Sequence, residues 1–157
     1  MAISIGSTNA KPYVGSKEVK EAYVGSTLVY SAGPVNPVIF QGTEINYRYS
    51  GTNFTETTEG FKMTGASELT FTGVDLSTFN RLYVEAYNTS GSNVSLTVNF
   101  IDNSGNVSAS ITKLFEAHSS SGNSYAIPPE YIKPRAKIKL SSTNGRNIVL
   151  KSARLLS

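Results

Sequence analysis

The chain has 157 residues, with no cysteine, no tryptophan, one histidine and no long apolar run. Without cysteine, disulfides, thiolate metal sites and cysteine nucleophiles are all excluded. No segment approaches the roughly 20 apolar residues that a membrane-spanning helix needs, so we expect no membrane partner. The first residues, MAISIGSTNAK, lack the basic segment and apolar core of a signal peptide, so we expect a protein made in the cytoplasm.

Catalytic side chains are also scarce. The single histidine, His118, lies beside a Ser/Gly loop and has neither metal-ligand spacing nor a nucleophile motif around it. A glycosidase would need two close carboxylates, and nothing in the sequence pairs distant glutamates such as Glu44 and Glu85. Glycine motifs that bind phosphate are missing as well. We therefore predict that the protein is not an enzyme and has no catalytic residue.

Calcium is the one cofactor for which the sequence offers candidate ligands, because calcium binds carboxylate and carbonyl oxygens in loops. Gln41, Glu44 and Asp102 are residues of this kind. The simpler interpretation is that they are ordinary turn and surface residues. We predict no cofactor and assign no metal site, and a structural calcium ion stays open as the alternative.

A ten-residue phrase is repeated near the start of the chain. The segment Tyr13-Val14-Gly15-Ser16 returns as Tyr23-Val24-Gly25-Ser26, and a fainter copy stands at residues 5–8. A Gly-Ser pair between two β-prone runs favours a two-residue hairpin turn, since glycine tolerates a positive φ at its first position. Such ribbons are marginally stable alone. We expect residues 1–33 to form small hairpins in series that finish folding against a partner or another copy.

The rest of the chain has the pattern of an all-β domain. Gly33, Pro34 and Pro37 mark a linker over residues 34–40. Beyond it, short apolar-alternating runs are separated by Ser, Asn, Asp and Gly, which predicts an antiparallel β-sandwich (jelly roll) over residues 41–157. The expected strands are residues 61–64, 68–71, 81–88, 94–101, 107–114, 136–140 and 148–151, with turns at 88–93, 102–105, 119–123 and 141–145.

Alternation within two of these strands predicts a binding face. Leu82, Val84 and Ala86 form an inward row, as do the apolar residues of the run at 94–101. We expect these two strands to pair across their short turn. Their outward residues would then share one face with the aromatic, carboxylate, amide and hydroxyl groups that suit sugars. The candidate glycan-binding residues are Tyr83, Glu85, Tyr87, Thr97 and Asn99.

The alternative interpretation of this face is an exposed strand surface on which tyrosine and threonine serve only as good strand formers.

Basic residues are concentrated toward the end of the chain, where half of the 14 lysines and arginines follow residue 132. Arg135, Lys137 and Lys139 alternate with apolar residues and are expected to form a basic interface stripe along one strand. That stripe would attract an anionic glycan, a teichoic-acid-like polymer or an acidic protein surface. Lysines on strands also discourage aggregation. No nucleic-acid-binding module accompanies the charge, so we expect no nucleic-acid partner.

The opening segment YVGSKEVKEAYVGSTLVYS resembles the short repeated module at the N-termini of bacteriophage tail, baseplate and fibre proteins. The resemblance covers about 30 residues. It implies a virion location and attachment to other virion proteins of the capsid, tail or baseplate. It also implies a homo-oligomer whose copy number follows the symmetry of the attachment site. The implied particle-attachment residues are Tyr13, Val14, Gly15, Tyr23, Val24, Gly25 and Tyr30.

The run FNRLYVEAYNTSGSNVSLTVNFIDNSGNVSASI is similar to the central strands of jelly-roll carbohydrate-binding modules, although these commonly present tryptophan to sugars. Together the two resemblances imply a structural bacteriophage virion protein, anchored by its N-terminal segment, whose jelly roll is displayed to bind host-surface glycans. One alternative is a purely architectural capsid or tail decoration protein without glycan binding. Another is a free-standing carbohydrate-binding module or a remnant glycan-active enzyme.

Overall fold

The computed structural model describes residues 13–14, 17–18, 21–24, 27–31, 37–143 and 147–157. The chain divides into two compact units, Met1–Val35 and Asn36–Ser157. In the described residues every regular element is a β-strand except the 3₁₀ turn η1 (Pro129–Tyr131), which confirms the predicted all-β class. The described part of the chain therefore contains no helix of the length and apolarity that a membrane crossing requires.

The first unit contains the hairpins that the repeated phrase predicts. Strands β1 (Tyr13–Val14) and β2 (Lys17–Glu18) pair antiparallel. Strands β3 (Glu21–Val24) and β4 (Thr27–Ser31) do the same in the second copy. The expected attachment residues Tyr13, Val14, Tyr23, Val24 and Tyr30 lie on these strands, whereas Gly15, Gly25 and the copy at residues 5–8 lie outside the described residues.

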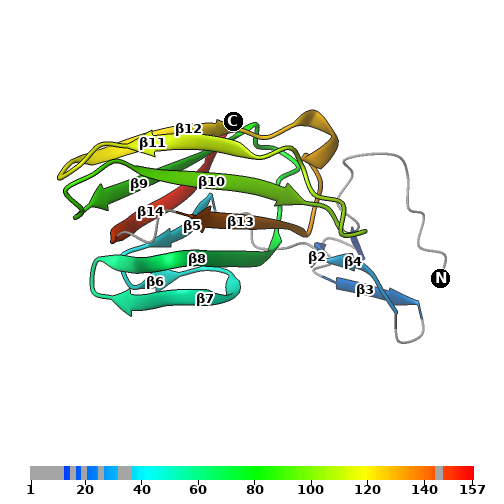
Figure 1. The fold of residues 1–157 in the computed structure, drawn as a ribbon. Coiled ribbons are helices and arrows are strands. Elements are labelled where there is room, and N and C mark those ends of the chain that lie inside the picture. The colour runs from blue at the N-terminus through cyan, green and yellow to red at the C-terminus, as the bar shows by residue number, and fades with distance from the viewer. Residues whose placement is uncertain (1–12, 15–16, 19–20, 25–26, 32–36, 144–146) are drawn as a thin grey trace. The chain divides into compact units, whose positions relative to one another are not determined.

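The second unit is a jelly roll of ten strands in two antiparallel layers (Figure 1). The β9 layer has the order β12-β9-β14-β5-β6, and the β10 layer has the order β11-β10-β13-β8-β7. The bounds are β5 Val38–Gln41, β6 Glu44–Ile45, β7 Arg48–Thr57, β8 Gly60–Val74, β9 Arg81–Asn88, β10 Val94–Ile101, β11 Ile111–Phe115, β12 Ser120–Ala126, β13 Ala136–Ser142 and β14 Ile148–Leu156.

A short pairing between β8 and β14 joins the two layers. Phe61 of β8 is opposite Leu150 of β14, and Met63 is opposite Ile148. Further along, β8 pairs with β13 while β14 pairs with β5, so the hydrogen-bonded sheet continues around a corner. This corner places the two layers face to face over one core.

The core contains the inward rows that alternation predicts. Leu82, Val84 and Ala86 of β9 are fully buried, and so are the apolar residues of β10. An aromatic cluster fills the region near the corner, where the Phe40 and Phe61 ring centroids are 5.0 Å apart with an edge-to-face geometry that stabilises aromatic pairs. The remaining rings of this cluster are Tyr49, Phe54 and Phe71.

Two expected non-strand segments are strands in the structure. Residues 38–40, assigned to the linker, belong to β5, because Ile39 and Phe40 fill the core and are fully buried. Residues 119–123, expected as a turn, contain the start of β12, which pairs with β9 from Ser120 to Ala126. Its Ser- and Gly-rich sequence lacks apolar alternation, so only the neighbouring strand identifies it. The ten-residue strand β7 was likewise not predicted.

The predicted pairing of the strands at 81–88 and 94–101 is wrong. Strand β9 lies between β12 and β14, whereas β10 lies between β11 and β13 in the opposite layer. The two inward rows face each other across the core, and each row helps to bury the other. If β9 and β10 paired side by side, both rows would lie in one layer and another layer would have to bury them. The short segment after β9 is therefore a crossover between layers.

Asn88 holds this crossover in place. The side chain is completely buried, and its Nδ2 group donates to the carbonyl oxygens of Ser92 at 2.8 Å, Phe115 at 3.1 Å and Glu116 at 3.0 Å. Its Oδ1 atom accepts a hydrogen bond from the backbone N–H of Ser90 at 2.9 Å. One amide thus links the end of β9 to the crossover and to the end of β11.

We predict that Asn88→Ala lowers the free energy of unfolding by about 2–4 kcal/mol, because it leaves a buried carbonyl unpaired and opens a cavity. Urea denaturation measures the change. The control is Asn80→Ala, at an exposed residue, which should change the free energy by less than about 0.5 kcal/mol. Equal effects of the two substitutions would show that the amide does not hold the crossover.

Candidate functional site

The outer side of the β9 layer carries two tyrosines. Tyr83, Glu85 and Tyr87 occupy alternate positions of β9, and each points outward because its neighbours on the strand are buried. Both tyrosines are half-buried, and Glu85 is exposed. The tyrosine face consists of these three residues together with Gly122 of β12 and Lys151, Ser152 and Arg154 of β14.

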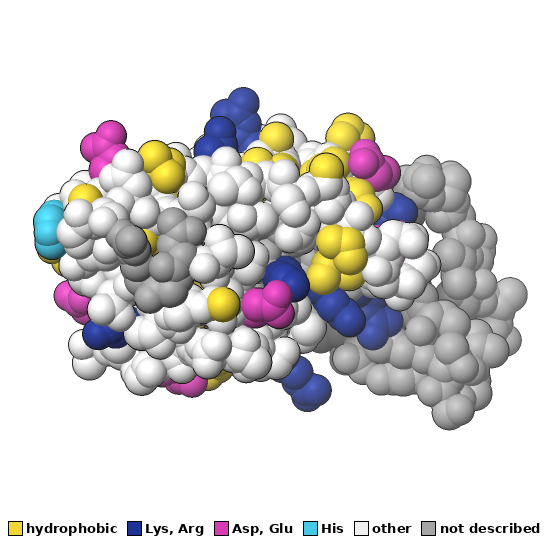
Figure 2. All heavy atoms as spheres, viewed as in Figure 1, with side chains coloured by type: hydrophobic (Ala, Val, Ile, Leu, Met, Phe, Trp, Pro, Cys, Tyr) yellow, Lys and Arg dark blue, Asp and Glu magenta, His cyan; other side chains and the backbone are white. Residues whose placement is uncertain are grey.

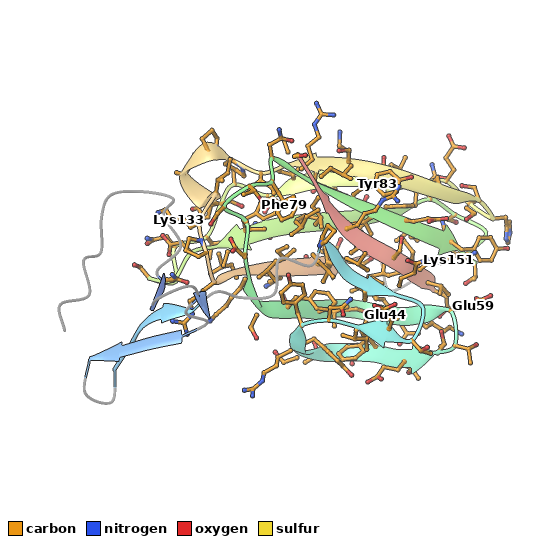
Figure 3. All side chains as sticks on the ribbon, turned by 180° about the vertical axis from the view of Figure 1, so that it is seen from behind. Glu44, Glu59, Phe79, Tyr83, Lys133 and Lys151 are labelled. Carbon is orange, nitrogen blue, oxygen red and sulfur yellow. The ribbon has the colours of Figure 1, made fainter. Side chains whose placement is uncertain are left out.

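Cations from β14 hold both rings. The Arg154 Cζ atom is 4.9 Å from the Tyr83 ring centroid, and the Lys151 Nζ atom is 5.6 Å from that of Tyr87. Each contact contributes about 0.5–1 kcal/mol at an exposed site. Figure 3 shows Tyr83 and Lys151 on the side of the molecule away from the view of Figure 1. The rings are thus positioned by a neighbouring strand.

Gly122 leaves room for the Tyr83 ring. A Cβ atom at Gly122 would lie 1.8 Å from the Tyr83 Oη atom and 2.2 Å from its Cζ atom. The ring therefore lies across the backbone of β12, where any side chain would displace it. The result is a flat aromatic surface bordered by the Glu85 carboxylate, which the Ser152 Oγ atom approaches at 3.5 Å.

The structure separates the other two expected glycan-binding residues from this face. Thr97 and Asn99 lie on β10, on the outer side of the opposite layer. Thr97 forms a 2.9 Å hydrogen bond with Thr112, and Asn99 is 8% exposed, its Nδ2 group donating to the Ser108 carbonyl at 3.1 Å. The expectation that all five residues share one face is wrong, because it depended on pairing β9 with β10.

The basic stripe is also altered by the fold. Lys137 and Lys139 point outward from β13, as alternation predicts. Lys139 forms an ion pair with Glu68 of the neighbouring strand β8, at 2.5 Å between Nζ and Oε1. Arg135 precedes β13 and has φ +61°, so it does not continue the strand alternation. The expected stripe of three cations along one strand is therefore reduced to Lys137 and Lys139.

A hollow of about 410 Å³ lies between the β5–β6 and β7–β8 turns, and no pattern in the sequence predicted it. Glu56 on its wall accepts a hydrogen bond from the Tyr49 hydroxyl. The pKa of Tyr49 is raised, mainly by this hydrogen bond and to a smaller extent by burial. The hollow adjoins the tyrosine face, since the Gly42 N–H donates to the Lys151 carbonyl at 2.9 Å. Its walls are Gly42, Thr43, Ile45, Glu56, Thr57, Thr58, Gly60 and Phe61.

The candidate calcium ligands do not assemble into a site. Gln41 and Glu44 pair in the β5–β6 hairpin, near the β8–β14 corner, whereas Asp102 follows β10 at the other end of the layer. The Asp102 carboxylate accepts hydrogen bonds from Asn106 and from the Ser104 N–H, and these lower its pKa. Among the described residues no group of three or more His, Asp or Glu side chains could hold a metal ion.

Comparisons with known proteins show the fold alone. No family model and no curated protein sequence matches the chain. An agarase, AgWH50C, has a TM-score of 0.58 at 11% identity, covering 76% of this chain and 24% of the agarase. Carbohydrate-binding module CBM36, solved with calcium and xylotriose, has a TM-score of 0.52 at 10% identity, covering 70% of this chain and 93% of the module.

A third similar structure is the enzymatically active domain of bacteriophage CBA120 tailspike protein 4, with a TM-score of 0.51 at 15% identity, covering 80% of this chain and 22% of that chain. This chain thus spans about a quarter of the agarase and tailspike chains, but nearly the whole of the binding module. These likenesses place the second unit in the jelly-roll class to which carbohydrate-binding modules belong.

We predict that Gly122→Ala moves the Tyr83 ring off β12, while the free energy of unfolding changes by less than about 1 kcal/mol because the ring can rotate into solvent. Nuclear Overhauser contacts between the Tyr83 ring and residue 122 report the displacement. Gly91→Ala is the matched control, since its Cβ atom would meet only His118 Nε2 at 3.5 Å. Ring contacts that persist in Gly122→Ala would contradict the close approach.

Proposed function

We propose that the β-sandwich binds a glycan on the tyrosine face and catalyses no reaction on it. The observation that carries this proposal is the outward row of β9, in which Glu85 lies between Tyr83 and Tyr87, both held by cations. The two tyrosines are four residues apart on one strand, which separates their backbones by about 13 Å. That separation suits an oligosaccharide better than a single sugar.

The chemistry of this face matches the two kinds of surface on a sugar. The apolar C–H side of a sugar ring stacks on an aromatic ring, and its hydroxyls bond to charged and polar groups at the edge. Glu85 accepts hydrogen bonds from sugar hydroxyls, and Lys151 and Arg154 donate them. Further support comes from CBM36, a module of the same fold whose solved complex contains xylotriose. The agarase is similar to this chain over only 24% of its own length.

We further propose that the glycan-binding unit is displayed on a bacteriophage virion, attached through the first unit. The supporting observations are the repeated phrase, the hairpins β1–β2 and β3–β4, and the jelly-roll likeness to a phage tailspike domain. Small hairpins gain stability when a partner covers them. Several copies on one particle would bind a host-surface glycan with avidity far above that of one sandwich.

We predict that Tyr83→Ala and Tyr87→Ala each weaken glycan binding about tenfold, because each removes a stacking surface and one contact of a cation. A glycan array first identifies the ligand, and titration calorimetry then measures the affinity. The control is Leu114→Ala, which removes an exposed apolar side chain from β11. Unchanged binding in both tyrosine variants would eliminate this face as the glycan site.

The virion proposal predicts that full-length protein sediments with source particles lacking it, while a version starting at Pro34 stays in solution. Sedimentation of the full-length form alone would identify residues 1–33 as the anchor. If both forms sediment equally, the sandwich itself docks on the particle. That outcome would contradict the proposed anchor and favour the purely architectural decoration protein.

A further inference from the structure

The outer side of the β10 layer carries a row of polar residues from three adjacent strands. Arg48 of β7 is opposite Thr72 of β8, and Thr72 is opposite Lys137 of β13. All three point outward, because Tyr49, Phe71, Ala136 and Ile138 beside them pack in or against the core. We call Arg48, Thr72 and Lys137 the cationic row.

Neither cation of this row has an acidic partner among the described residues. Arg48 and Lys137 are exposed, and no carboxylate in the described part of the chain lies within ion-pair distance of either. The neighbouring Lys139 differs, since its ion pair with Glu68 offsets its charge. Figure 2 shows Lys and Arg side chains gathered over β13 and β8, beside an acidic side chain. The exposed positive charges of Arg48 and Lys137 are therefore aligned perpendicular to the strands.

Protection of a sheet edge does not explain Lys137. Lysines that prevent aggregation stand on edge strands, where unpaired backbone groups would otherwise recruit another chain. Strand β13 is central, with β10 on one side and β8 on the other. Its lysine guards no open edge, whereas Arg48 stands on β7, which among the described strands pairs with β8 alone.

We propose that the cationic row binds an anionic polysaccharide. Arg48 and Lys137 are two strands apart, which separates their backbones by about 10 Å, so they can contact successive carboxylate or sulfate groups along one polymer. The Thr72 hydroxyl, which donates to the Arg48 carbonyl at 3.4 Å, lies between them, and Ser50 and Thr70 follow in the next row of the same face. These hydroxyls provide hydrogen-bond partners for the sugar hydroxyls between the charged groups.

The side chains of this face favour a polysaccharide over a nucleic acid. Single-stranded nucleic acids are bound by positive grooves with aromatic side chains on which bases stack. On β7, β8 and β13 the aromatic residues Tyr49, Phe54, Phe61 and Phe71 all pack in or against the core, so the outward rows around Thr72 offer no ring. A surface of hydroxyls and cations without a stacking ring therefore suits an anionic polysaccharide.

This inference does not rest on the tyrosine face, which lies on the other layer. The test measures binding to immobilised polygalacturonate and dextran sulfate, with neutral dextran as the uncharged probe, at low salt and at about 0.3 M salt. Arg48→Gln combined with Lys137→Gln should weaken binding to a charged polymer about fivefold or more. The matched control is Arg81→Gln combined with Lys113→Gln, which removes the same charge from exposed residues elsewhere and should change binding less than about twofold.

Three outcomes would overturn the proposal. Equal losses in the two double variants would show that net charge alone attracts the polymer. Unchanged binding in the first variant would remove the row from consideration. If single-stranded DNA binds as tightly as the charged polymers, and its binding falls by the same factor in the first double variant, the ligand is a nucleic acid. Tyr83→Ala combined with Tyr87→Ala should leave binding to the charged polymers intact, which separates a failure of this inference from a failure of the tyrosine face.

Discussion

The short pairing between β8 and β14 is the interaction on which the position of both outer faces depends. It turns one hydrogen-bonded sheet around a corner, so that Phe61 and Leu150 sit at the junction of two layers. Gly60 allows the close approach there, since a Cβ atom at that residue would lie 2.1 Å from the Leu150 carbonyl oxygen. Once the layers face each other, every inward row fills one core and every outward row belongs to one of two opposite surfaces.

Contacts between the layers preserve this arrangement beyond the corner. Asn88 ties the crossover after β9 to the end of β11. Tyr125 of β12 is fully buried, and its hydroxyl approaches the Leu96 carbonyl of β10 at 3.5 Å. Burial raises the pKa of Tyr125, so its hydroxyl stays neutral. Asn88 and Tyr125 are thus two buried polar side chains that connect one layer to the other.

The two outer faces differ in chemistry because the neighbouring strands contribute different side chains to each. The Tyr83 ring lies over the backbone at Gly122 and contacts the Arg154 cation. These two residues come from the strands on either side of β9. On the opposite layer, threonines and serines surround Arg48 and Lys137 without exposed rings. One sandwich therefore presents an aromatic surface on one layer and a cationic surface on the other, and each is the subject of a separate binding proposal.

The sequence by itself determined the all-β class, the bounds of β9 and β10, and which side of each strand is buried, because strand periodicity is a local property. It also determined the paired strands of the repeated phrase. Tertiary structure alone decided which strands are neighbours, since pairing depends on how distant rows share a core. Tyr83 and Glu85 therefore stayed together on one strand, whereas Thr97, predicted beside them, lies on the far layer. Lys139 was predicted as part of the basic stripe, but its ion-pair partner Glu68 comes from a strand about 70 residues earlier in the chain, which strand periodicity does not show.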